Sequence, residues 1–319
     1  MRYRLFASVI AFMSVVSLAV LGAAGGWTPP RTPWGDPDLQ GVYSNDDETG
    51  TPLERPAEFA GRTLSDITPA EMKDINRRRT TQFNAGVSGD EFAGGLRPPT
   101  HLIFDSFDRR NSRPWLIVDP PDGRVPALTA QAQERAAARA AERRAHPADG
   151  PEDRSLGERC LLFNAGPPML PGPYNNFMQV IQTRDYVAIH NEMIHDARVV
   201  PLDSRPHAPS QLRLWLGDSR GHWDGNTLVV DTTNFTDKTN VRGSSPNLHL
   251  IERLTRTDAN TLLYEFTVDD PSSFVKPWSA ALPMRRTAEL VFEYACHEGN
   301  HALQGILRGA RFEEKSKPH

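Results

Sequence analysis

The second half of the chain alternates apolar and polar residues in short runs, which is the pattern of half-buried β-strands. Turn-forming residues separate the runs, as in Asp224-Gly225-Asn226 and Asp258-Ala259-Asn260. The spacing around the second of these turns is that of a β-hairpin. The pattern predicts strands over residues 178–182, 187–193, 197–202, 227–235, 249–256, 261–268 and 288–295. Short strands with short connections favour an antiparallel sheet curled into a barrel or a sandwich.

The first half of the chain is less regular. Residues 27–60 are rich in Pro, Gly, Asp and Asn, which predicts an extended arm ending in a short strand. Thr68, followed by a proline and then by Glu71, has the spacing of a helix start, and this helix is expected to reach about residue 79. Two more strands are predicted over residues 100–107 and 115–119.

Two further helices are predicted. Residues 131–145 are rich in alanine and charge, so the helix has good propensity but no apolar face to bury. Residues 300–315 carry an amphipathic repeat that Gly305 and Gly309 weaken, and we expect this helix to pack on the sheet. The fold class is therefore mainly β: an antiparallel barrel-like (lipocalin-like) sheet with an irregular N-terminal arm and a C-terminal amphipathic helix.

Four segments follow from these patterns. Residues 1–24 have a basic start, an apolar run and small residues, which is typical of a secretory signal peptide, with a retained membrane anchor as the alternative. Residues 25–125 are expected to form the N-terminal arm, short helix and strands that pack on the core. Residues 126–150 are an exposed helical spacer, and residues 151–319 form the barrel-like domain. The mature protein is expected in the periplasm or outside the cell.

Composition narrows the function classes. The net charge is −4, from 36 basic and 40 acidic residues, which lacks the basic footprint of a nucleic-acid-binding protein. The 27 prolines and 23 glycines imply many turns and disfavour a helical bundle. The two cysteines, Cys160 and Cys296, form either a disulfide, as an oxidising compartment allows, or two buried free thiols.

Several motifs resemble those of a large family of exported bacterial β-rich proteins, found in acidobacteria and proteobacteria. The resemblance covers most of residues 30–315 and implies an exported β-rich protein, without implying a particular reaction. The motifs that carry it are Gly157-Glu158-Arg159-Cys160, Gly166-Pro167-Pro168-Met169-Leu170-Pro171, residues 191–198, residues 215–223, Asp231-Thr232-Thr233-Asn234-Phe235 and residues 294–300.

The segment Tyr186 to Arg198 gathers histidines and carboxylates on one predicted strand, which suggests a site because such groups are rarely buried without partners. Strand parity places Asn191 and His195 on the core face. His195 is then a candidate acid or base, with Asn191 positioning the substrate, and a hydrogen-bonded core histidine is the alternative. His190 and Glu192 fall on the opposite face, expected to be solvated, and are secondary candidates.

A second candidate group lies between the last predicted strand and the C-terminal helix. His297 and Glu298 form a possible acid–base pair, and Tyr294 could orient the substrate. The alternative is that Glu298 and Asn300 only cap the helix, since carboxylates and amides are favoured at helix N-termini.

A third group follows the apolar run at residues 227–230. Asp231 is a candidate catalytic carboxylate, and Asn234, Trp215 and Trp223 are candidate substrate-binding residues. The alternatives are a structural ion pair for Asp231, with Arg198, Arg213 or Arg253, and a loop packed by its own tryptophans. On the predicted hairpin, the charges of Glu252-Arg253 and Tyr264-Glu265 are attributed to pairing across the strands.

The histidine spacing disfavours a metal centre. His190 and His195 fall on opposite faces of a continuous strand, so they are not expected to bind one metal ion together. A Gly-x-Gly-x-x-Gly run is missing, so dinucleotide-dependent chemistry loses its strongest signature. No metal and no cofactor are expected.

These patterns predict an exported, metal-independent acid–base enzyme, such as a lyase, isomerase or hydrolase. Its substrate is expected to be a small, partly apolar molecule bound in the barrel, with no nucleic-acid partner and no membrane contact once the signal peptide is removed. One alternative is a lipocalin-like carrier without turnover. The other is an envelope interaction protein that uses the Pro-rich arm.

Overall fold

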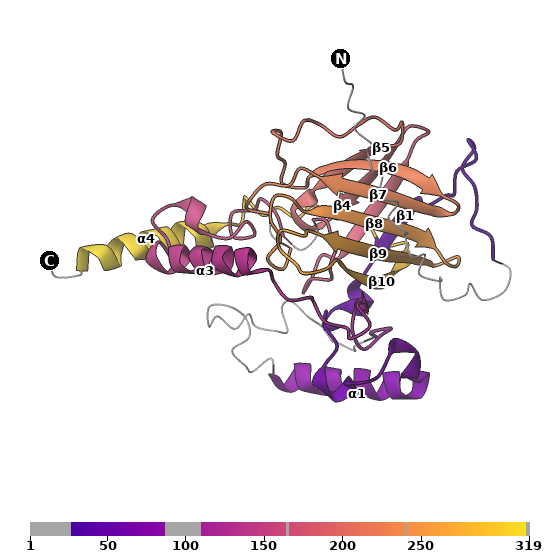
Figure 1. Ribbon diagram of the computed structural model, residues 1–319, viewed down its shortest axis with the longest axis horizontal. Helices are drawn as coiled ribbons and strands as arrows, with labels where there is room; N and C mark the ends of the chain where they lie inside the picture. The colour runs from indigo at the N-terminus through magenta and orange to yellow at the C-terminus, as the bar shows by residue number, and fades with distance from the viewer. Residues whose placement is uncertain (1–26, 87–109, 164–165, 240, 317–319) are drawn as a thin grey trace, which may run out of the picture.

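One antiparallel sheet of ten strands forms the body of the protein, seen here in a computed structural model (Figure 1). The structure describes residues 27–86, 110–163, 166–239 and 241–316. The order along the sheet is β5-β4-β3-β1-β10-β9-β8-β7-β6, and β2 pairs with β10 off this path. The strands are β1 Gly41–Ser44, β2 Ile117–Asp119, β3 Phe177–Gln182, β4 Tyr186–Asn191, β5 Ala197–Pro201, β6 Asp218–Asp224, β7 Thr227–Thr233, β8 His249–Arg256, β9 Thr261–Asp269 and β10 Trp278–Thr287.

The sheet curls but is not closed by hydrogen bonds. Its two edge strands, β5 and β6, come into contact where Gly221 faces Val200 and Leu202. A Cβ atom at Gly221 would lie 2.8 Å from the side chains of both residues, so only glycine allows this approach. The predicted mainly β, antiparallel class is confirmed, and the sheet is an open one whose edges meet.

Alternate residues of the strands face inward and fill the curled sheet with side chains. A single apolar core runs across all the long strands. Its members include Val187 and Ile189 on β4, Leu250 and Leu254 on β8, Tyr264 and Phe266 on β9, and Trp278 and Leu282 on β10. The inner face is therefore a packed core along most of its length.

A buried ion pair crosses this core. Arg198 on β5 forms two hydrogen bonds with Glu252 on β8, at 2.6 and 2.9 Å, and the hydroxyl of Tyr264 donates to the same carboxylate at 2.7 Å. Burial opposes the charge on Arg198, but the adjacent carboxylate more than offsets it and holds the pKa of Arg198 above its ordinary value. Burial and the Glu252 charge raise the pKa of Tyr264 well above its ordinary value. The pair links opposite parts of the sheet across the interior.

The N-terminal segments form a second layer beside the sheet. The helix α1, Pro69–Gly86, starts at the predicted proline and packs through Met72 and Ile75 against Phe59 and Trp115. The arm is built into the sheet, because β1 lies between β3 and β10. The sheet therefore takes strands from both sides of the predicted spacer. The signal peptide at residues 1–24 and the strand predicted at 100–107 lie outside the described residues.

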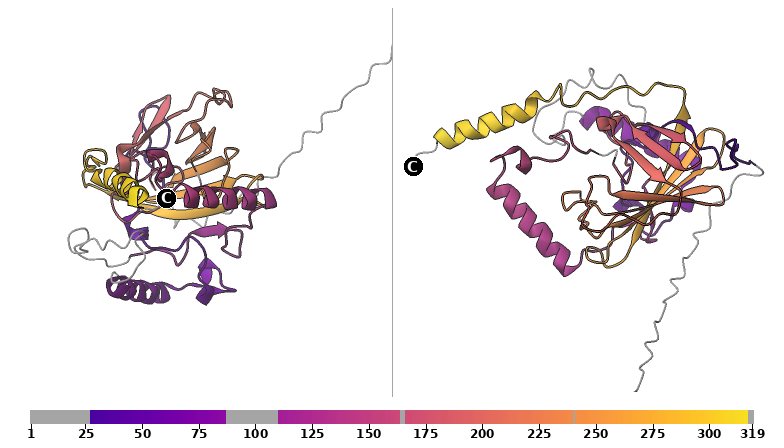
Figure 2. Two further views of the ribbon diagram at one scale, coloured as in Figure 1. Left: turned by 90° about the vertical axis from the view of Figure 1, so that its left-hand side faces the viewer. Right: turned by 90° about the horizontal axis from the view of Figure 1, so that it is seen from above.

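The other two helices project from one side of the sheet (Figure 2). The helix α3, Ala130–Ala145, is mostly exposed, and Ala132 is its one buried residue. The helix α4, His301–Ser316, also forms as predicted, but it does not pack on the sheet, and none of its residues is buried. Gly305 and Gly309 interrupt its apolar face, and polar bonds hold it instead, such as Arg311 to the backbone oxygen of Asp149 at 2.9 Å.

Three sequence-based strand assignments differ from the structure. The segment predicted as a strand at residues 288–295 is irregular, because the chain leaves the sheet after β10 at Thr287. The strand β10 was not among the predicted strands, and it contains Pro283, a residue type that is rare inside strands. That proline lies between the stretch of β10 paired with β2 and the stretch paired with β1, where one side of β10 is not paired with any strand in the described part of the chain. The strand β6 was not predicted, because its glycine and charged residues interrupt the apolar pattern of a strand.

A disulfide joins Cys160 to Cys296, which decides between the two alternatives left open by the sequence. It ties the irregular segment after β10 to the segment before β3. Such a bond fits an oxidising compartment. Among the described helices, none has the length and apolar character needed to cross a membrane.

Candidate functional site

The turn after β4 breaks the strand that was predicted to continue to Met193. The strand ends at Asn191, and one short 3-10 turn, η5 (Met193–His195), leads toward β5. Ile194 and His195 have left-handed backbone conformations, with φ of 60° and 47°. The parity prediction is therefore wrong for this pair: Asn191 is buried, but His195 is exposed.

Glu192 lies in the interior and not on the solvated face that parity predicted. Only 2% of it is exposed, because the turn redirects the chain after Asn191. Its Oε1 accepts a hydrogen bond from the backbone N–H of Phe292 at 3.1 Å. Its Oε2 is buried and has no hydrogen-bond partner in the described part of the chain. His190 lies on the opposite face of β4 from Asn191 and is half-buried.

The loop after β10 packs against this turn, so two of the predicted segments meet. The Nδ1 atom of His195 lies 3.2 Å from the backbone oxygen of Tyr294. The Tyr294 hydroxyl lies 3.4 Å from that of Tyr174, and burial together with this contact raises the pKa of Tyr294 to about 12. His297 and Glu298 are exposed, and their side chains make no hydrogen bond or ion pair with the residues that the structure describes.

Helix capping at the start of α4 belongs to Asn300 and not to Glu298. The Asn300 Oδ1 accepts from the backbone N–H of Leu303 at 3.3 Å, and its Nδ2 donates to the backbone oxygen of Glu158 at 2.7 Å. The cavity beside Asn191, which Asn45 and Asn176 also line, measures about 20 Å³. That volume is enough for about one water molecule and too small for an organic substrate.

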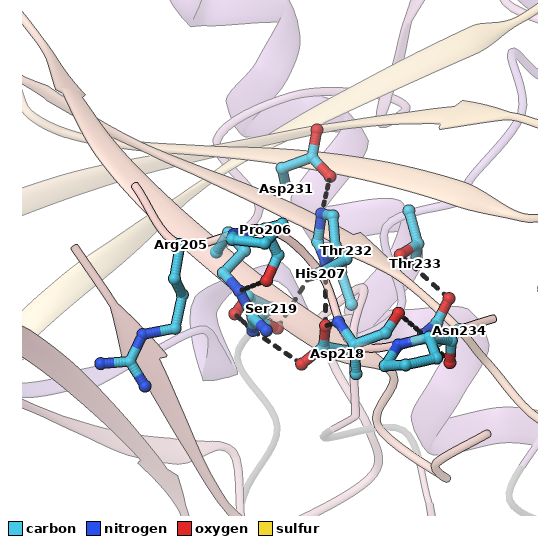
Figure 3. Close-up of polar contacts among 12 residues, drawn as sticks. Arg205, Pro206, His207, Asp218, Ser219, Asp231, Thr232, Thr233 and Asn234 are labelled. Atoms are coloured by element: carbon cyan, nitrogen blue, oxygen red, sulfur yellow. Dashed lines mark hydrogen bonds and ion pairs between the residues drawn. The ribbon is translucent and has the colours of Figure 1, made fainter. Parts of the chain in front are cut away.

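Asp231 belongs to a row of alternating carboxylates and imidazoles on the outer face of the sheet (Figure 3). His207, from the loop between β5 and β6, lies between Asp218 and Asp231, with Nδ1 and Nε2 at 3.0 and 2.9 Å from their oxygens. The other oxygen of Asp231 lies 2.6 Å from Nε2 of His249 on β8. Arg220 ends the row with a 2.6 Å bond to Asp218.

The prediction that Asp231 pairs with an arginine is wrong. Arg198 pairs with Glu252, and the partners of Asp231 are His207 and His249. Burial alone would raise the pKa of Asp231, but hydrogen bonds and attraction from His249 and His207 more than offset it and lower that pKa. The Asp231 hydrogen bond raises the pKa of His249 against the opposing effect of burial. The row therefore places paired charged groups on the surface of the sheet, and its contacts attach the β5–β6 loop to the strands.

The charge on this row makes stability depend on pH. His249 has a raised pKa in the folded state, so its contribution is complete below about pH 6.5 and is lost as the pH rises through that raised value. The pKa of Asp231 is lowered, so its contribution is present above about pH 4 and is lost as the pH falls. His249→Gln is expected to cost about 1 kcal/mol at pH 5.5, since both groups are one-third exposed and screened.

Urea unfolding of wild type and H249Q at pH 5.5 and pH 9 measures this difference. The gap between the two proteins should be smaller at pH 9 than at pH 5.5, because the contribution of the charged His249 is lost as the pH rises through its raised folded-state pKa. His301→Gln, at an exposed histidine on α4, is the matched control and should change neither value. A gap that is equal at the two pH values would contradict the assigned role of His249.

The remaining predicted binding residues hold loops in place. Asn234 follows β7 in a left-handed backbone conformation, and its side-chain amide donates to the backbone oxygen of Ala208 at 2.9 Å. The backbone oxygen of Trp215 accepts from the Thr239 hydroxyl at 2.8 Å. Trp223 packs against the main core. The tract is therefore not a loop packed by its own tryptophans, because Trp223 belongs to the strand β6.

A cleft of about 1670 Å³ lies between the N-terminal layer and the outer face of β8, β9 and β10. Figure 1 shows α1 running beside the β10 side of the sheet. Its lining is mostly apolar, from Leu64, Ile67 and Met72 on one side, Ile251, Leu263 and Ala281 on the sheet, and Trp115 and Ile117 between them. Its volume exceeds the usual range of about 300–1,000 Å³ for small-molecule sites.

Charged groups converge on the sheet wall of this cleft. Glu265 is half-buried and makes no hydrogen bond or ion pair with the described residues. Burial raises its pKa, although Arg253 and Arg113 act in the opposite direction. Arg113 donates to the backbone oxygen of Ala281 at 2.8 Å, and burial lowers its pKa. An unpaired carboxylate with a raised pKa, in an apolar cleft, is typical of a functional site.

The sequence analysis assigned Arg253 and Glu265 to charge pairing across the hairpin, and this prediction is only partly right. Arg253 and Glu265 stand opposite each other on β8 and β9, as cross-strand pairing requires. However, Arg253 forms its ion pair with Asp224 at 2.8 Å, on the strand β6 that was not predicted. The cleft also needs α1 beside the sheet, which no local pattern specifies.

Neither the search for a metal centre nor the comparison with known proteins indicates a function. Among the described residues, no group of three or more His, Cys, Asp or Glu side chains is arranged to hold a metal ion. No protein-family model matches the chain, and no curated protein matches it. One solved structure, a mutant of the fluorescent protein UnaG, is similar at 14% identity and a TM-score of 0.23, over 35% of this chain and 72% of that chain. A likeness at this level carries no argument about this protein.

Proposed function

We propose that the protein binds a small, partly apolar molecule in the cleft between α1 and the outer face of β8, β9 and β10. The observation that carries this proposal is the combination of a 1670 Å³ apolar cleft with the unpaired Glu265 on its wall. The inner face of the sheet offers a weaker site, since it is a packed core with a cavity of about 20 Å³ beside Asn191.

Export belongs to the same proposal. The apolar run at residues 5–21 has the form of a signal peptide, and the resemblance of the motifs to exported bacterial proteins points the same way. The Cys160–Cys296 disulfide supports it, because such bonds persist in the periplasm and outside the cell. The protein would then meet its ligand in the envelope or the medium.

Acid–base turnover in this cleft is the second candidate function. The observation that favours it is Glu265, whose raised pKa in an apolar setting suits a proton donor or acceptor. His195, His297 and Glu298, which the sequence suggested for this chemistry, lie at the surface. A carrier and an enzyme would share the cleft and differ in whether the bound molecule leaves unchanged.

A neutral apolar fluorophore, N-phenyl-1-naphthylamine, tests the cleft directly. Leu263→Gln places a polar group on the sheet wall, and we expect it to weaken binding of the fluorophore about tenfold. Leu212→Gln is the matched control, since Leu212 is 52% exposed in the β5–β6 loop and should leave binding unchanged.

Equal binding by wild type and L263Q would exclude the cleft as the binding site. Molecules that co-purify with the wild-type protein can be identified by mass spectrometry and returned to it. Recovery of the same compound indicates a carrier, whereas recovery of an altered compound indicates an enzyme.

A further inference from the structure

We propose that the ligand of this cleft is an anionic amphiphile, with an apolar body along the sheet wall and a carboxylate or similar anion near Arg113. The inference rests on the proposed function and adds the ligand's charge. It follows from the imbalance of the charged side chains that line the cleft.

Five basic side chains and two acidic ones line the cleft: Lys73, Arg77, Arg110, Arg113 and Arg253 against Asp224 and Glu265. Two of the bases are already neutralised, because Arg253 pairs with Asp224 and Arg77 pairs with Asp74. Lys73 and Arg110 make no ion pair with any residue that the structure describes. The lining therefore carries an excess of positive charge around an apolar surface.

Arg113 is the best placed of these cations to bind an anion. One of its nitrogens donates to the backbone oxygen of Ala281, which holds the guanidinium against the sheet wall. Its remaining donors have no partner among the described residues, and they are not enclosed away from solvent. A guanidinium fixed at one nitrogen presents its other N–H groups in a planar fork, which matches a carboxylate.

Glu265 offsets only part of this charge. It lies on the same wall and attracts Arg113, but it makes no ion pair with a described residue. Lys73, Arg110 and Arg113 therefore face one carboxylate of the lining. A cationic ligand would meet this excess of positive charge in a cleft of low polarity, which is unfavourable.

Three compounds with the same alkyl chain and different head groups test the charge. Laurate, dodecanol and dodecylamine compete with N-phenyl-1-naphthylamine, each below the concentration at which it forms micelles. We expect laurate to displace the fluorophore at about one-tenth of the dodecanol concentration, from one charge-assisted hydrogen-bond pair, and dodecylamine to be the weakest. Tighter binding of dodecylamine than of laurate would overturn the inference.

The variants Arg113→Met and Lys73→Met test where the carboxylate of laurate binds. Each variant should lower the affinity for laurate while leaving dodecanol unchanged, and Arg113→Met should have the larger effect, about tenfold. Lys73 is exposed on α1, so K73M tests the charge even if R113M is poorly folded. Lys238→Met, at an exposed lysine of the β7–β8 connection, is the control.

The outcomes separate the two proposals. If dodecanol binds and laurate binds no better, the cleft is a binding site but its ligand is not an anion. If neither compound binds and the fluorophore is insensitive to L263Q, the proposed function itself fails. If laurate binds better in wild type but equally well in R113M and K73M, the anion lies elsewhere and the inference is overturned.

Discussion

Replacing Arg198 with methionine is expected to lower the free energy of unfolding by about 3–5 kcal/mol. The substitution leaves the Glu252 carboxylate fully buried, with Tyr264 as its remaining hydrogen-bond donor among the described residues. An uncompensated charge in a packed core costs far more than the loss of a surface ion pair. Urea unfolding of wild type and R198M at neutral pH measures the difference.

The double variant Arg198→Met, Glu252→Leu separates the charge from the packing. Removing both partners removes the uncompensated carboxylate, so the double variant should regain most of the stability that R198M loses. Arg205→Met is the matched control, because Arg205 pairs with Asp203 at the exposed surface, where losing an ion pair changes the free energy of unfolding far less than in the core. An R198M protein as stable as R205M would show that the cross-core pair does not stabilise the fold.

The sequence pattern predicted this sheet well where burial alternates regularly. The strands β8 and β9 alternate buried and half-buried residues along their whole length, and the predicted ranges match the observed ones almost completely. The pattern failed where a special contact replaces alternation. Gly221 in β6 serves the approach to β5, and Pro283 in β10 occupies a position that, in the described part of the chain, is paired on one side only.

The site was harder to predict because its residues meet through tertiary packing. Two partial successes came from local signals: Asn191 faces the interior, and the segment around Tyr294 does reach the turn at His195. The partners that matter most carry no local signal. His207 lies in an irregular loop, and Arg113 reaches the cleft only because the segment that leads into β2 lies beside β10.

Removing the Cys160–Cys296 disulfide is expected to have the second large effect on stability. The bond closes a loop of 136 residues, and the loss of loop-closure entropy in the unfolded chain corresponds to about 5 kcal/mol in the chain-entropy model. Native-state strain and residual structure usually reduce this value, so we expect a loss of about 3–5 kcal/mol for the double variant Cys160→Ser, Cys296→Ser. Urea unfolding with and without a reductant measures it.

The disulfide variant also tests how the segment after β10 is held. Without the bond, that segment is attached to the turn after β4 by polar contacts, such as the Glu192 bond to the Phe292 N–H and the His195 contact with Tyr294. Amide exchange at Phe292 should therefore speed up more than exchange in β8, because local release needs less free energy than unfolding of the core. Reductant should change wild type and leave the serine variant unaffected. Equal acceleration at both positions would mean that the segment and the sheet unfold together, and that the disulfide stabilises the whole fold through one cooperative unit.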